Sequence, residues 1–192
     1  MDDRSSAAFV EASTFFVEMV NLVTDDEWET PGLGEWTVRQ LVAHANRGQT
    51  TLVEYVDRPQ QPEPQGGEYF SSEAIAARGR EAVAALGDDP LRAVKAASTA
   101  AIELLARSSP ATIVGSPMGT MSIARYVPSR IAELVIHTLD LAKAIVQDVS
   151  VPDGALEETL VFVVRRSARN APLDVLLALT GRGQLPADYS VF

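Results

Sequence analysis

Apolar residues recur along this chain mostly at intervals of three, four and seven positions, which is the spacing of amphipathic helices. Phe9, Phe16 and Val23 are seven residues apart. With the apolar positions beside them they form one continuous face, which predicts a helix from about Ser6 to Thr24.

A second helix has a clear start signal. Thr37 and Gln40 match the capping box, in which each side chain bonds the backbone N–H of the other residue. Trp36 and Leu41 match the hydrophobic staple that often accompanies it. The apolar stripe that follows carries His44 on its flank.

The rest of the chain is divided by Gly and Pro. We predict a Pro/Gly linker at 59–67, helix from 71 to about 107 with a break at 87–90, a hairpin or ordered loop at 111–127, a helix from about Pro128 to Gln147, and two shorter helices within 153–180. Gly181 is expected to cap the last helix. These elements predict an all-α fold, a four-helix bundle with long crossovers and extra C-terminal helices. We expect a single domain over residues 1–192, with residues 150–192 as a helical extension packed on the bundle.

Composition narrows the range of functions. The net charge of −10 leaves no excess of Lys and Arg to bind nucleic acid or an anionic membrane surface. The chain has no cysteine, which excludes thiolate ligands and a cysteine nucleophile. No apolar run is long enough to span a bilayer, and the acidic N-terminus does not resemble a signal peptide. We therefore expect a cytoplasmic location.

The chain has only two histidines, and both lie in predicted helices. His137 follows Glu133 by four residues, so the two side chains share one helix face. With His44 they form a candidate three-ligand site for a divalent metal that leaves one coordination position open. This donor set suits zinc, although nickel or another transition metal can occupy it. A buried core histidine and a surface Glu–His pair are the simpler alternatives.

Two further residues are candidates for roles at a site. Asp140 follows His137 by three residues and can orient the ligand imidazole or act as a base, and it can equally lie at the solvent edge. Arg182 follows Gly181 and can bind a cofactor carboxylate, or it can bond the carbonyls at a helix end. Arg165, Arg166 and Arg169 can attract an anion or form a solvated helix face.

Three segments together resemble a known family. They are Trp28-x-x-Pro31-x-x-x-x-Trp36 continuing through TVRQLVAH to His44, the segment from Glu133 to Asp140, and LALTGR ending at Arg182. The first two resemble the metal motifs of the mycothiol-dependent maleylpyruvate isomerase family, which belongs to the DinB-like helical bundles. The third resembles a sequence often found near the end of actinobacterial members.

The resemblance implies an up-down-down-up four-helix bundle with a divalent metal, usually zinc, held by His44, Glu133 and His137. It also implies the use of a low-molecular-weight thiol such as mycothiol. The chain ends soon after Arg182, so we expect no second domain like that of the namesake enzyme and do not assign its substrate.

From these observations we expect a metal-dependent, thiol-using transferase or isomerase that acts on a small electrophile. A metal-dependent hydrolase and a non-catalytic metal- or ligand-binding bundle are the alternatives. The expected partners are a small-molecule thiol and its electrophile, without nucleic acid or membrane, and the protein is a monomer or a homodimer.

Overall fold

A computed structural model describes residues 3–56 and 71–191. It contains α1 (Asp3–Val20), β1 (Pro31–Leu33), β2 (Trp36–Thr37), α2 (Val38–Val56), α3 (Ser72–Leu86), α4 (Pro90–Arg107), β3 (Ile113–Ser116), β4 (Gly119–Ser122), α5 (Ile123–Ala144), α6 (Asp153–Asn170) and α7 (Pro172–Leu179). The chain is mostly helical with two small antiparallel hairpins, which confirms the predicted all-α fold.

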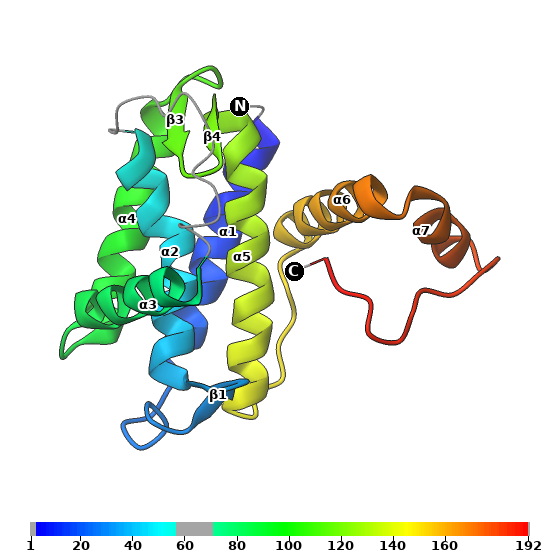
Figure 1. Ribbon diagram of the computed structural model, residues 1–192. Helices are drawn as coiled ribbons and strands as arrows, with labels where there is room; N and C mark the ends of the chain where they lie inside the picture. The colour runs from blue at the N-terminus through cyan, green and yellow to red at the C-terminus, as the bar shows by residue number, and fades with distance from the viewer. Residues whose placement is uncertain (1–2, 57–70, 192) are drawn as a thin grey trace.

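Four helices form the bundle. α1 packs on α4 and α5, and α2 packs on the same two helices from the other side. α1 and α5 run in one direction while α2 and α4 run in the opposite direction (Figure 1). Their facing side chains form one apolar core, in which Phe9, Phe16, Leu41 and Ile131 are fully buried. α3 covers α2, and α6 packs on α5 and α1.

A buried polar network ties three of the four core helices together. The hydroxyl of Ser13 in α1 donates to Oε1 of Gln49 in α2 at 2.5 Å and lies 2.6 Å from Oγ of Ser98 in α4. The amide nitrogen of Gln49 donates in turn to Asn46. Since each of these polar groups is buried, the network favours one alignment of α1, α2 and α4.

The predicted start and stop signals are largely confirmed. Thr37 N–H donates to the Gln40 side chain at 2.9 Å, and Gln40 N–H donates to the Thr37 hydroxyl at 3.3 Å, which completes the capping box. Asp89 caps α4 ahead of Pro90. Gly181 has a positive φ of 67°, and the next N–H bonds the carbonyl of Leu177, as in a Schellman cap.

The bounds of two helices were predicted wrongly, and one hairpin was not predicted. α1 spans 3–20 rather than 6–24, because residues 21–24 form a turn and not a further helical turn. α5 begins at Ile123 rather than Pro128. Pro128 therefore lies inside the helix, where its missing N–H removes one backbone hydrogen bond. β1 and β2 pair in a short hairpin that was not predicted from the sequence. The linker predicted at 59–67 lies outside the described residues.

The C-terminal helices extend away from the bundle (Figure 1). α6 contacts α5 and α1, whereas α7 makes its extensive contacts with α6 alone among the described elements. The assignment of residues 1–192 to a single domain stays a prediction. No helix in the described ranges combines the length and the apolar composition needed to cross a membrane.

Candidate metal centre

The start of α2 is anchored by the loop that precedes it. Backbone N–H groups of Val38 and Arg39 donate to the carbonyls of Thr30 and Trp28. The Arg39 guanidinium lies 5.4 Å from the centroid of the Trp28 ring, and its Nε donates to Glu29. These contacts, with the capping box, fix the first turns of α2 and therefore the position of His44 two turns further on.

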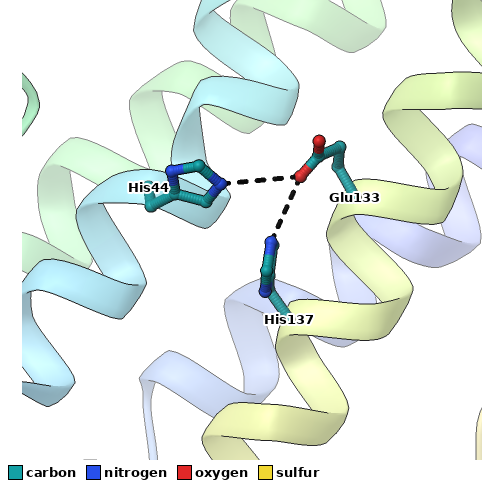
Figure 2. A group of neighbouring side chains, drawn as sticks. All are labelled: His44, Glu133 and His137. Carbon is teal, nitrogen blue, oxygen red and sulfur yellow. Dashed lines mark ion pairs between the residues drawn. The ribbon is translucent and has the colours of Figure 1, made fainter. Parts of the chain in front are cut away.

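His44, Glu133 and His137 converge between α2 and α5 (Figure 2). One carboxylate oxygen of Glu133 lies 3.2 Å from Nε2 of His137 and 3.7 Å from Nε2 of His44. All three candidate ligand atoms lie within 4.8 Å of one another. Among the residues that the structure describes, this is the one group of three His, Cys, Asp or Glu side chains so arranged.

These distances fit a shared cation. Ligand atoms about 2.0–2.2 Å from a zinc ion at tetrahedral angles are separated from one another by about 3.3 Å. The two Glu133–imidazole separations, 3.2 and 3.7 Å, bracket that value. The donor set of two imidazoles and one carboxylate is also the one found in several catalytic zinc sites.

Neighbouring side chains orient both imidazole rings. Nδ1 of His137 is hydrogen-bonded to Asp140 at 3.0 Å, which leaves Nε2 to face Glu133. The ring of Trp36 lies 4.7 Å from that of His44, centroid to centroid. The two imidazoles meet edge to face, with centroids 4.9 Å apart and planes at 87°.

The three candidate ligands differ in their exposure to solvent. The exposed fraction of the side chain is 16% for His137, 26% for Glu133 and 39% for His44. The His137 side therefore faces the interior of the protein. His44 is the ligand most exposed to solvent.

Arg130 adds a positive charge next to the carboxylate. Its guanidinium lies 4.0 Å from the second oxygen of Glu133 and 4.9 Å from the centroid of the Tyr126 ring. This contact of Arg130 was not predicted from the sequence. It could have been predicted, because Arg130 precedes Glu133 by three residues and side chains at that spacing are neighbours on a helix.

The electrostatics favour an ionised carboxylate. Burial opposes ionisation of Glu133, but hydrogen bonds from His137 and His44 and the charge of Arg130 outweigh it and hold the pKa of Glu133 far below its ordinary value. Burial likewise disfavours protonated His137, yet its bonds to Glu133 and Asp140 raise the pKa of His137. Glu133 and His137 therefore each favour the charged form of the other.

Arg182 is not brought to this site. It lies beyond α7, and its Nη1 donates to the carbonyl of Thr180 at 2.9 Å. The other predicted arginines lie on α6, where Nε of Arg166 donates to the carbonyl of Val191. A role for Arg182 in cofactor binding gains no support from this position.

A family model described as the mycothiol maleylpyruvate isomerase N-terminal domain matches residues 9–142. The chain belongs to this family. The match contains His44, Glu133, His137 and Asp140, whereas α6 and α7 lie outside it. Membership of the mycothiol maleylpyruvate isomerase N-terminal domain family supports a thiol-related function. No curated protein and no solved structure matches the chain.

Proposed function

We propose that this protein is a metal-dependent enzyme that uses a low-molecular-weight thiol of the mycothiol type to transform a small electrophilic substrate. The observation that carries the proposal is the convergence of His44, Glu133 and His137 on one point, in a chain that belongs to a mycothiol-associated family. Zinc is the metal that this donor set suits best, and nickel is the next candidate.

The residues at the site would have different roles in binding the metal and the thiol. His44 and His137 would supply neutral nitrogen ligands and Glu133 an anionic oxygen, which leaves one position for the thiol. A divalent cation held in this way lowers the pKa of a bound thiol and makes its sulfur nucleophilic at neutral pH. Asp140 would hold the His137 ring with Nε2 toward the cation, and Trp36 would restrict the ring of His44.

The sulfur would then add to an electrophilic carbon of the substrate. Elimination of the same sulfur after rotation about the former double bond gives an isomerase, whereas retention of the new carbon–sulfur bond gives a transferase. Both outcomes need the same site.

Metal content is the first test. The wild-type protein should retain close to one divalent cation per chain by elemental analysis, and His44→Ala and His137→Ala should each lose most of it. Glu133→Gln should also bind the metal more weakly, whereas Glu103→Gln, a matched change at an exposed position of α4, should not. Unchanged metal content in both histidine variants would overturn the proposed site.

Thiol binding is the second test. In the Co²⁺-substituted protein, mycothiol should produce a new near-ultraviolet charge-transfer band, because a sulfur ligand joins the metal. S-methylated mycothiol, which lacks the ionisable thiol, should not. A metal-loaded protein whose spectrum does not respond to mycothiol would refute the thiol function and leave the metal site intact.

Hydrolysis is the second candidate function, and the carboxylate of Asp140 beside the site is the observation that favours it. That carboxylate is hydrogen-bonded to His137, so it is poorly placed to take a proton from water at the open position. Hydrolysis therefore ranks below thiol chemistry. Turnover of an ester or amide without added thiol would reverse this order.

A further inference from the structure

α6 and α7 present an apolar surface that no described part of the chain covers. We call it the arm face. Its members are large apolar side chains with exposed fractions from 37% to 67%: Leu156, Leu160, Val161, Val164, Leu173, Leu176 and Leu179. Large exposed apolar side chains gathered on neighbouring helices are a common mark of a protein interface.

α6 and α7 join the rest of the protein through residues other than those of the arm face. The buried residues of α6 are Ala155, Thr159 and Ser167, and that of α7 is Val175. The C-terminal tail returns to α6, where the carbonyl of Val191 accepts a hydrogen bond from Arg166. The arm face stays exposed with this tail in place.

Charge is distributed unevenly along α6. Its first half carries three acidic residues, and its second half carries three basic ones. They are Asp153, Glu157 and Glu158, followed by Arg165, Arg166 and Arg169. Glu157 is paired with Arg4 of α1 at 2.6 Å, so the pairing between copies rests on Glu158. Two such helices attract each other when they lie antiparallel, because each acidic half then faces a basic half.

We infer that the arm face binds the arm face of a second copy of this chain, with the two α6 helices antiparallel about a two-fold axis. The inference goes beyond the metal-dependent function and does not depend on it. A two-fold contact uses the same patch on both copies, so the patch must be complementary to itself. The apolar side chains and the reversed charge halves of α6 meet this requirement together.

The spacing along α6 locates the centre of the contact. Glu158, Val161 and Arg165 follow one another at intervals of three and four, so they share one side of the helix. In an antiparallel pair centred between residues 161 and 162, Glu158 of one copy faces Arg165 of the other, twice. Val164 and then Leu160 lie further round the helix, on the other flank of Val161 from Glu158, so they add apolar contact beside the charge pairs.

The mass of the protein in solution tests the inference. Sedimentation equilibrium at tens of micromolar should give twice the chain mass of 20.6 kDa. Leu160→Glu should raise the dissociation constant by at least about tenfold, because it places a charge at a leucine that is 55% exposed in the single chain and that the dimer would cover. Leu22→Glu is the matched control, since Leu22 is 47% exposed but lies outside the arm face. Circular dichroism should show that both variants keep their helix content.

Exchanging the charges of Glu158 and Arg165 tests whether the partner is a second copy of this chain. Glu158→Arg and Arg165→Glu should each weaken the dimer, because like charges then face each other, and the double variant should restore it. A wild-type monomer at these concentrations would overturn the inference, as would a double variant that is no better than the singles. Binding of the wild-type monomer to anionic vesicles through Leu160 would assign the arm face to a membrane instead and would equally overturn it.

Discussion

The Nδ1 atom of His137 lies 3.0 Å from Oδ2 of Asp140, one turn further along α5. This contact selects the tautomer and orientation in which Nε2 of the same ring faces Glu133. Asp140 thus orients His137 so that its Nε2 and the Glu133 carboxylate can bind the same cation. The relationship leads to the first of four predictions.

Asp140→Asn should weaken metal binding about 10–100-fold, the usual effect of losing a carboxylate that orients a ligand imidazole. Competition with a chromophoric chelator measures the affinity directly. The helix content should not change, because the side chain of Asp140 is partly exposed. An affinity equal to that of the wild type would show that Asp140 does not position His137.

Gly48 permits the close crossing of α2 and α5 next to the metal centre. A Cβ atom at this position would lie 3.1 Å from Cγ of Leu134, a side chain that is fully buried. Gly48→Ala should gain about 1 kcal/mol of helix propensity but lose about 1–3 kcal/mol to overpacking, with a net loss of stability. Urea unfolding measures this difference in free energy.

Gly79 is the control for that experiment, because nothing lies within 4 Å of a Cβ atom placed there. Gly79→Ala in α3 should therefore raise the free energy of unfolding by up to about 1 kcal/mol. Gly48→Ala should also weaken metal binding, since it separates His44 from Glu133, whereas Gly79→Ala should not. Equal gains of stability in both variants would show that the helix crossing tolerates a methyl group.

The buried network around Ser13 should make a measurable contribution to stability. Ser13→Ala removes the donor to Gln49 and leaves a buried amide oxygen without its partner, at a cost of about 1–3 kcal/mol. Thr14→Ala, a neighbouring change at an exposed position of α1, should alter stability by no more than about 0.5 kcal/mol. Thermal or urea unfolding of the two variants compares them, and similar values would argue that the network contributes little.

The metal-free protein should show a pH dependence that comes from His137. Its pKa is raised in the folded state, so the stabilisation from its protonated ring is complete below the unfolded value of about 6.5 and is lost as the pH rises through the folded value. Glu133 has the opposite sign, because its pKa is lowered and its contribution is lost only in acid.

We therefore expect the difference in free energy of unfolding between the wild type and His137→Gln to shrink as the pH rises above about 6.5. Both proteins are stripped of metal with a chelator before the measurement. A difference that stays constant over this range would mean that the imidazole is not held protonated by its neighbours.

Local sequence determined the helices and most of their ends. The apolar spacing predicted the bundle, and the capping box at Thr37 and Gln40 marked the start of α2 within one residue, because such signals depend on contacts between residues a few positions apart. The start of α5 was missed, since the tight hairpin before it delivers the chain into a helix ahead of Pro128. The pair Glu133 and His137 was also predictable, because residues four apart on a helix share a face.

What sequence could not decide was whether His44 faces that pair. This depends on the rotation of α2 against α5, on their close approach at Gly48 and on the packing of Trp36 over the imidazole. Sequence also could not decide the role of Arg182. It was a candidate for binding an anion, but its guanidinium bonds the carbonyl of Thr180 at the end of α7. The sequence by itself thus determined the elements and the residue types at the site, through contacts that are local along the chain. Only the tertiary structure brought the donors within 4.8 Å and left the arm face uncovered, because both depend on how helices distant in sequence pack against one another.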